Sequence, residues 1–161
     1  MNILIADLEC DSLRPSTIHM VGVLDYFTDE FTDYNGDNVV DGLLRLSEAD
    51  LVIFYNGKGY DIPVIERLTN GLITFRPDQI IECLDMSRRL VTMENHKLKT
   101  WGEIFEFPKG DHTDFSKWSK NMSVYCERDC RLTKKVFDVL NEISIGRGST
   151  CLLEGYKNES A

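Results

Sequence analysis

The feature that most constrains the fold of this chain is a short apolar run near the N-terminus that ends in two carboxylates. Residues 3–6 read Ile-Leu-Ile-Ala, which is typical of a strand buried on both faces of a sheet. Asp7 and Glu9 follow, with one residue between them. Because side chains alternate along a strand, both acids should point to one face, about 7 Å apart along the strand, while Leu8 points to the other. This spacing predicts a place where one or two metal ions could be held.

The bulk composition bounds the class of protein. With 161 residues, 42% hydrophobic and 28% charged, the chain resembles one soluble globular domain. No apolar run is long enough to span a bilayer and no signal peptide is evident, so we expect a cytoplasmic protein, in the host cytoplasm if it is viral. The five cysteines form no Cys-x-x-Cys pair, which argues against a disulfide framework. A net charge of −9 argues against a protein that coats nucleic acid by phosphate neutralisation alone.

Hydrophobic periodicity predicts an α/β domain. Strands are expected over residues 3–9, 17–24, 25–34, 50–55 and 79–84, and helices over 39–49, 60–68, 85–93, 98–105 and 121–143. The first three strands are expected to pair antiparallel, and the strand after the first helix is expected to return by a parallel crossover. Residues 1–143 would then form the domain, followed by a loosely attached tail at 144–161.

The last helix carries a second group of candidate site residues. Its apolar stripe consists of Leu132, Val136, Leu140 and Ile143. Extended toward the helix start, the same stripe reaches Asp129 and then Tyr125, so the face that packs on the sheet turns from apolar to acidic. A carboxylate on a buried face is costly unless it is paired or coordinated. The alternative reading is an ordinary salt bridge between Asp129 and a Lys or Arg.

Asp61 is the third candidate. It follows a strand end and the loop at residues 56–59, which reads Asn-Gly-Lys-Gly and can approach a ligand closely because glycine has no Cβ. The alternative reading is an acid at a helix N-terminus, where the helix dipole favours negative charge.

Each acid alone has an ordinary explanation, but the four together predict a different kind of site. The four acids are Asp7, Glu9, Asp61 and Asp129, at a strand end, a strand-to-helix loop and a helix face. Carboxylates that converge in this way repel one another unless cations are bound. Two-metal hydrolysis of a phosphodiester is the chemistry that uses such an arrangement.

These residues resemble the motifs of the DEDD exonuclease superfamily. The motifs are Asp-x-Glu at residues 7–9, Asn-x-x-x-(Phe/Tyr)-Asp at 56–61 and Tyr-x-x-x-Asp at 125–129, in the expected order. Tyr125, with Val124 where the other branch has histidine, marks the Tyr-type branch, which includes polymerase proofreading domains and RNase D-like enzymes. The segment at residues 96–102, His-Lys-Leu-Lys-Thr-Trp-Gly, is similar to a helix of those proofreading domains. The resemblance covers residues 1–143.

The resemblance implies a fold, a reaction and a role for each site residue. The fold would be ribonuclease H-like, a mixed five-stranded sheet flanked by helices. The reaction would be metal-dependent 3′-to-5′ hydrolysis of DNA, single strands preferred, with release of nucleoside 5′-monophosphates. Two Mg²⁺ or Mn²⁺ ions would be held by Asp7, Glu9, Asp61 and Asp129. Tyr125 would position the attacking water, and Leu8 and Asn56 would contact the substrate.

Three questions stay open at this point. An RNA-directed enzyme of the same branch is the first alternative, because phosphate contacts do not distinguish DNA from RNA. The candidate phosphate-binding cations are Lys97, Lys99, Lys109, Lys117 and Lys120. A catalytically inactive adaptor with this fold is the second alternative, against which the intact acids argue. No polymerase sequence follows the domain, so the chain would act alone, as a small phage exonuclease would, or with a separate polymerase.

Overall fold

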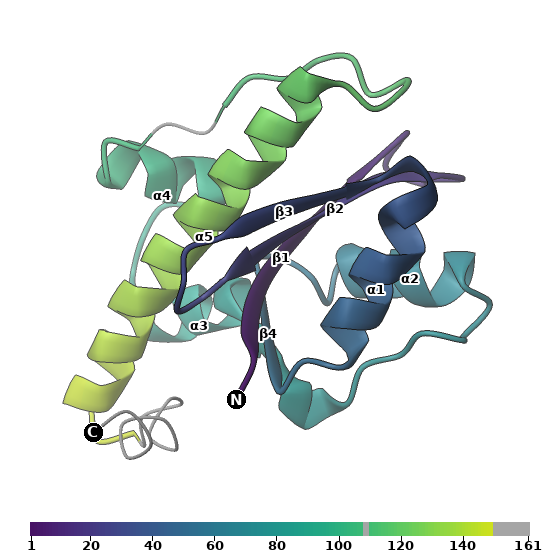
Figure 1. The fold of residues 1–161 in the computed structure, drawn as a ribbon. Helices are drawn as coiled ribbons and strands as arrows, with labels where there is room; N and C mark the ends of the chain where they lie inside the picture. Colours follow the sequence, from purple (N-terminus) through teal and green to yellow (C-terminus); the bar gives the residue numbers. More distant parts are fainter. Residues whose placement is uncertain (108–109, 150–161) are drawn as a thin grey trace.

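The protein is a three-layer α/β structure built on one mixed sheet (Figure 1). The computed structural model describes residues 1–107 and 110–149. Its sheet has five strands in the order β3-β2-β1-β4-β5. The strands are β1 (Ile3–Cys10), β2 (Ile18–Asp25), β3 (Phe31–Asn35), β4 (Leu51–Phe54) and β5 (Ile80–Glu82). The pairs β1–β2 and β2–β3 are antiparallel, whereas β4 pairs parallel with both β1 and β5. The predicted fold class and strand directions are confirmed.

Helices cover both faces of the sheet (Figure 1). One face carries α1 (Val39–Ser47) and α2 (Asp61–Leu68). The other face carries α3 (Cys83–Leu90), α4 (Leu98–Ile104) and the long α5 (Lys120–Gly146). Two short 3-10 turns, η1 (Gly36–Asn38) and η2 (Pro77–Gln79), precede α1 and β5.

Strand β1 divides its side chains between two separate cores. Ile3 and Ile5 are fully buried in a cluster that includes Leu132 and Val136 of α5. Leu4 and Ala6 belong to a second cluster on the opposite face, together with buried leucines of α1. Alternation along β1 therefore sends the odd-numbered residues toward α5, and this row continues into Asp7 and Glu9.

The boundary between β5 and α3 differs from the prediction. A strand was expected over residues 79–84 and a helix over 85–93, but β5 ends at Glu82 and α3 begins at Cys83. The reason is that the carboxylate of Glu82 accepts a hydrogen bond from the main-chain N–H of Leu84, at 3.1 Å, and so caps the helix. Strand β3 is also shorter than predicted, because turn and irregular residues precede Phe31.

The last helix is longer than predicted by one residue at its start and three at its end. Ser119 caps it by accepting a hydrogen bond from the main-chain N–H of Met122, at 3.1 Å. Of the predicted tail, residues 144–146 belong to α5, and residues 150–161 lie outside the described part.

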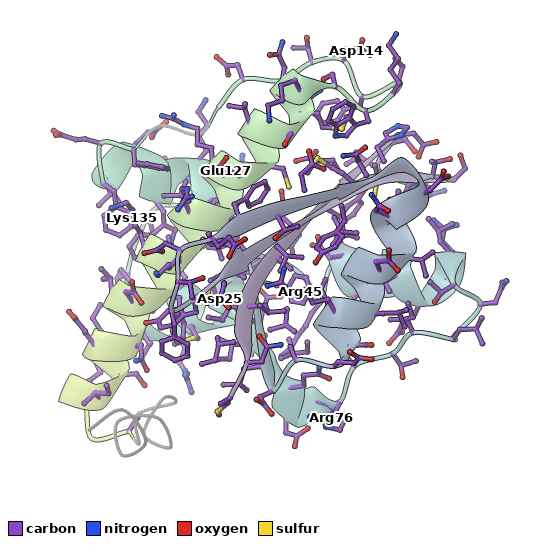
Figure 2. All side chains as sticks on the ribbon, viewed as in Figure 1. Asp25, Arg45, Arg76, Asp114, Glu127 and Lys135 are labelled. Atoms are coloured by element: carbon purple, nitrogen blue, oxygen red, sulfur yellow. The ribbon has the colours of Figure 1, made fainter. Side chains whose placement is uncertain are left out.

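Figure 2 shows the described side chains, with Arg76 and Asp114 exposed at the outside of the molecule. Among the described residues, no helix is both long and apolar enough to cross a bilayer.

Candidate metal and nucleic-acid site

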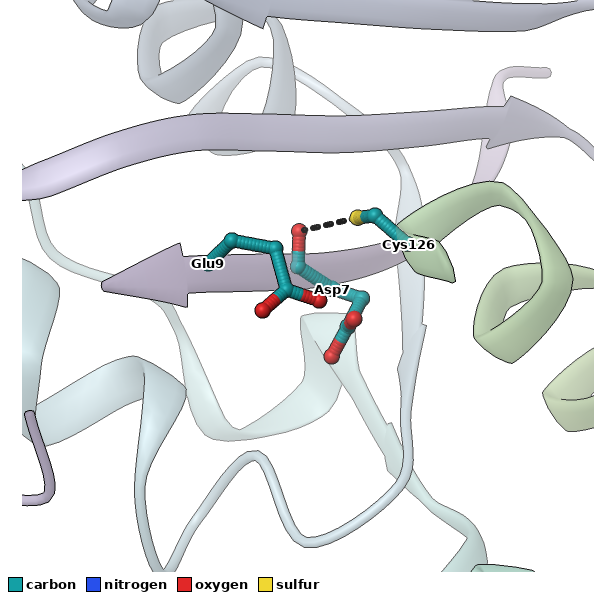
Figure 3. A group of neighbouring side chains, drawn as sticks. All are labelled: Asp7, Glu9 and Cys126. Atoms are coloured by element: carbon teal, nitrogen blue, oxygen red, sulfur yellow. Dashed lines mark hydrogen bonds between the residues drawn. The ribbon is translucent and has the colours of Figure 1, made fainter. Parts of the chain in front are cut away.

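Two carboxylates stand side by side at the end of β1. Asp7 and Glu9 continue the row of side chains that faces α5, and Figure 3 shows both carboxylates on one side of the strand. One oxygen of each, together with the thiol sulfur of Cys126, lies within a group whose members are no more than 4.8 Å apart. Glu9 is 4% exposed, so its charge lies in a poorly solvated place. Two carboxylate oxygens this close are suited to a shared divalent cation.

The thiol of Cys126 has a packing role in this arrangement. It donates a long hydrogen bond of 3.6 Å to the main-chain oxygen of Asp7 (Figure 3). Burial raises the pKa of the Cys126 thiol well above its usual range, so the thiol is protonated at neutral pH. Gly22 lies opposite Asp7 in β2, and a Cβ there would lie 2.4 Å from the Cys126 sulfur. The absence of a side chain at Gly22 therefore lets α5 pack closely against the strand that carries Asp7.

Asp61 reaches the same place from the other side of the sheet. It is the first residue of α2, and its Oδ1 accepts a hydrogen bond from the main-chain N–H of Leu8, at 3.1 Å. Burial, and after it the negative charge of Asp7, raises the pKa of the Asp61 carboxyl well above its usual range. A bound cation would relieve both costs, because it compensates the lost hydration and offsets the repulsion.

Helix α5 supplies Asp129 and Tyr125, one turn apart. Asp129 is only 4% exposed. The Tyr125 ring lies 5.8 Å from the His112 ring and 6.3 Å from the Phe115 ring, centroid to centroid. His19 hydrogen-bonds the main-chain oxygen of Phe115 at 2.9 Å, which ties the segment before α5 to β2. The aromatic contacts restrict the position of the Tyr125 ring beside the acids.

The loop between β4 and α2 is held by a buried acid that the sequence reasoning missed. The carboxylate of Glu82 accepts hydrogen bonds from the main-chain N–H groups of Asn56, at 2.6 Å, and Lys58, at 2.9 Å. Asn56 has a left-handed backbone conformation, with φ of 63°. A Cβ on Gly59 would lie 2.4 Å from the Asn56 side-chain oxygen, so only glycine leaves that side chain in place. The only sequence signal for Glu82 is its position directly after the apolar residues of β5.

All the predicted site residues lie around one cavity of about 440 Å³, which we call the acid cavity. Its walls include Asp7, Leu8, Glu9, Asn56, Asp61, Tyr125 and Asp129. The structure thus brings together every residue that the motifs singled out, from β1, the loop after β4, α2 and α5. Their roles as ligands, water-positioning group and substrate contacts stay predictions. The donors are carboxylate oxygens, the ligand type that Mg²⁺ and Mn²⁺ prefer, so the residues fit the predicted ions.

A second cavity of about 660 Å³, which we call the cationic cavity, adjoins the acid cavity. The two share Asp7, Tyr55, Asn56 and Asp129 as a common border. Beyond that border the cationic cavity is lined by Arg88 of α3 and by the segment before α4, including Asn95, His96 and Lys97.

Of the predicted phosphate-binding lysines, only Lys97 has a place in either cavity wall. Lys99, Lys117 and Lys120 line neither cavity, and Lys109 lies outside the described residues. Arg88 was not singled out from the sequence, and His96 was noted only as the first residue of the segment at 96–102, with no role of its own. The last turn of α3, which carries Arg88, gave no motif from which its place in the cavity could be foreseen.

The sheet order and the acids at the end of β1 define a ribonuclease H-like protein, and the comparisons with known proteins agree. The sequence profile of the RNase_H superfamily matches residues 4–114, and the chain belongs to this superfamily. Solved structures match as well; one is that of Brucella melitensis NrnC with bound Mg²⁺. It is 17% identical, with a TM-score of 0.70, and the match covers 95% of this chain and 78% of that one. No curated protein sequence matches the chain significantly.

Proposed function

We propose that the protein is a metal-dependent exonuclease that removes nucleotides from the 3′ end of single-stranded nucleic acid, with DNA as the first candidate substrate. The observation that carries the proposal is the convergence of four carboxylates and Tyr125 on the acid cavity. Membership of the RNase_H superfamily supports a nuclease of this kind. Asp7, Glu9, Asp61 and Asp129 would hold two Mg²⁺ or Mn²⁺ ions. When bound, the ions would supply hydroxide from water and offset charge on the phosphate.

The residues of the chain itself would orient the reactants. The Tyr125 hydroxyl would act as a hydrogen-bonding group toward the attacking water. Asn56 would contact the substrate from the loop that Glu82 fixes. Burial of Glu9, Asp61 and Asp129 limits bulk water around the scissile phosphate and strengthens each electrostatic contact there.

The shape of the acid cavity supports a single-stranded end as substrate. Leu13 is 90% exposed at its wall, and the Phe115 ring forms another part of it, so an unpaired base would find apolar contacts on entry. A duplex would first have to be opened at its end, at a mean stacking cost of about 1.4 kcal/mol per base-pair step. Single strands should therefore be cut faster than blunt duplexes.

The test uses a 5′-labelled oligonucleotide with Mg²⁺. The expected result is a ladder of labelled products that shortens with time, together with release of nucleoside 5′-monophosphates, and no cleavage in EDTA. Immediate release of a labelled 5′ mononucleotide would instead show attack from the 5′ end. Internal fragments without a ladder would show an endonuclease.

RNA is the second candidate substrate, because the superfamily that the chain matches is named for a ribonuclease. Arg88 and Lys97 of the cationic cavity could contact phosphates of either polymer, since such contacts carry no information on the sugar. Oligonucleotides of matched sequence, one DNA and one RNA, decide between the two. A kcat/KM that is higher for RNA would assign the enzyme to RNA ends.

A further inference from the structure

The cationic cavity contains a histidine that is held at two points. The ring Nδ1 of His96 lies 2.7 Å from the hydroxyl oxygen of Ser87. Its main-chain oxygen accepts a hydrogen bond from the hydroxyl of Tyr55, a residue of the border between the cavities. His96 therefore has a fixed place in the wall although it precedes α4 in an irregular segment.

The partners of Ser87 favour one position for the proton on the His96 ring. The indole N–H of Trp101 donates to the Ser87 oxygen at 3.0 Å, and this group can only donate. The Ser87 hydroxyl has one proton to give, and Nδ1 of His96, at 2.7 Å, is a closer acceptor than the Met93 sulfur, at 3.8 Å. With Nδ1 as acceptor, the neutral imidazole carries its proton on Nε2. Ser87 is fully buried and Trp101 is 4% exposed, so solvent does not compete for these bonds.

Among the described residues, the hydrogen bonds of the His96 ring involve Nδ1 alone. His96 lines the cationic cavity, and its Nε2–H can donate a hydrogen bond to a ligand bound there. Lys97 follows in the sequence, and Arg88 lines the same cavity from α3, both exposed. One oriented N–H donor with two exposed cations nearby is suited to an anionic oxygen.

The geometry points to a binding site in the cationic cavity for the phosphate that lies one step to the 5′ side of the scissile bond, with His96 Nε2–H as its donor. This inference rests on the proposed function and names the subsite for the upstream nucleotide. The scissile phosphate belongs at the border, next to Asp7 and Asp129, where metal ions would offset its charge. The next phosphate has no such ions and needs cations and donors of the protein. The acid cavity has no Lys or Arg in its described wall, so that phosphate fits the cationic cavity.

The test pairs two variants of His96 with two substrates. His96→Gln places an amide N–H near the position of Nε2, whereas His96→Asn places its amide near that of Nδ1. The substrates are a short oligothymidylate and the same oligonucleotide with a neutral methylphosphonate at the linkage one step 5′ of the terminal phosphodiester. Lys135→Ala is the control, because Lys135 is exposed on α5 and lines neither cavity.

His96→Asn and the methylphosphonate are each expected to lower kcat/KM for the first cut by about 10-fold, as befits a hydrogen bond to a charged group. Together they should lower it little further, because both remove the same contact. His96→Gln should retain most of the wild-type rate, and Lys135→Ala should change it less than about 2-fold. The inference would be overturned if the losses in kcat/KM from His96→Asn and from the methylphosphonate multiplied. Equal losses for His96→Gln and His96→Asn would also overturn it.

Failure of the proposed function gives a different pattern. If wild-type protein leaves the unmodified oligonucleotide intact, the exonuclease proposal is wrong. The subsite is then tested by the affinity of the protein for the same two oligonucleotides, measured by fluorescence anisotropy. Equal affinity of wild type for both oligonucleotides would overturn the subsite. NMR of the imidazole nitrogens gives a readout independent of substrate: the Nε2–H tautomer is expected in the wild type and should lose its preference in Ser87→Ala.

Discussion

The acid cavity and the cationic cavity share one border and differ in the charge and exposure of the side chains that line them. The acid cavity is lined by buried carboxylates, of which Glu9, Asp61 and Asp129 are at most 5% exposed. The cationic cavity adds Arg88 and Lys97, both of which are exposed. Under the proposed function, the buried acids would serve the chemical step and the exposed cations would bind the polymer. Changes in the acid cavity should therefore lower the rate at saturation, and changes in the cationic cavity should weaken binding.

The largest effect is expected from Asp7→Ala, because Asp7 lies at the border and belongs to both cavities. The substitution would remove a ligand of the proposed ions, and kcat should fall by several orders of magnitude while the protein stays folded. Single-turnover cleavage of a labelled oligonucleotide measures the loss, and a thermal melt checks the fold. Degradation at the wild-type rate would show that the acids do not form the active site.

Tyr125→Phe should have the next largest effect. The substitution keeps the ring and its contacts with His112 and Phe115 but removes the hydroxyl. Loss of a group that orients the attacking water should lower the chemical rate by about 10²–10⁴-fold, with metal and substrate binding close to wild type. Single-turnover kinetics with Mg²⁺ separate the rate of the chemical step from metal and substrate binding. An unchanged chemical step would leave Tyr125 with a packing role only.

Gly59→Ala tests the loop that joins the two cavities. The added methyl group would displace the Asn56 side chain, which lies at the shared border. Because a side-chain end can move at little cost, the melting temperature should change by only a few degrees. Activity should fall on the order of 10-fold, since a misplaced substrate contact is costly for catalysis. Gly146→Ala is the matched control, because within the described residues no atom outside its chain neighbours and its own helix backbone lies within 4 Å of the added Cβ. Equal activity of the two variants would show that the position of the Asn56 side chain does not matter for catalysis.

Asp61→Asn should lower turnover as the loss of a proposed metal ligand does, and it should also shift the melting temperature, which is the smallest change predicted here. Burial and the charge of Asp7 raise the pKa of Asp61 above its unfolded value of 3.8. The stability that the protonated carboxyl contributes is fully present below the unfolded pKa and is lost as pH rises through the folded one. Metal-free Asp61→Asn should therefore melt above the wild type at neutral pH, by an amount that shrinks toward pH 4. Saturating Mg²⁺ should reverse the order, because the wild type alone keeps the full ligand set. A lower melting temperature for the metal-free variant at neutral pH would contradict this account.

The sequence predicted the fold and the members of the acid cavity for a specific physical reason. The carboxylates of β1 and α5 continue apolar rows, so the periodicity that identifies Ile3, Ile5 and Leu132 as core also places Asp7 and Asp129 on facing surfaces. The apolar rows of β1 and α5 therefore end at the same end of the β1–α5 interface. For this reason the members of the acid cavity could be predicted from the sequence.

The cationic cavity could not be predicted in the same way. Its donor His96 depends on Ser87 and Trp101, which lie in α3 and α4 and meet only because both helices pack beside α5. Glu82 likewise acts through main-chain N–H groups of a distant loop, and such contacts leave no periodic signal in the sequence. The boundary of α3 was missed for the same reason, since the capping carboxylate is also the last residue of β5.

Under the proposed function, the acid cavity holds two divalent cations next to the scissile phosphate. Titration with Mn²⁺ in the presence of a nucleoside 5′-monophosphate, followed by electron paramagnetic resonance of the free ion, counts the bound ions directly. The account predicts two bound Mn²⁺ per chain in the wild type and fewer in Asp129→Asn, with Asp33→Asn, which lies in β3 outside both cavities, unchanged. No Mn²⁺ binding by the wild type, or equal binding by Asp129→Asn, would contradict it.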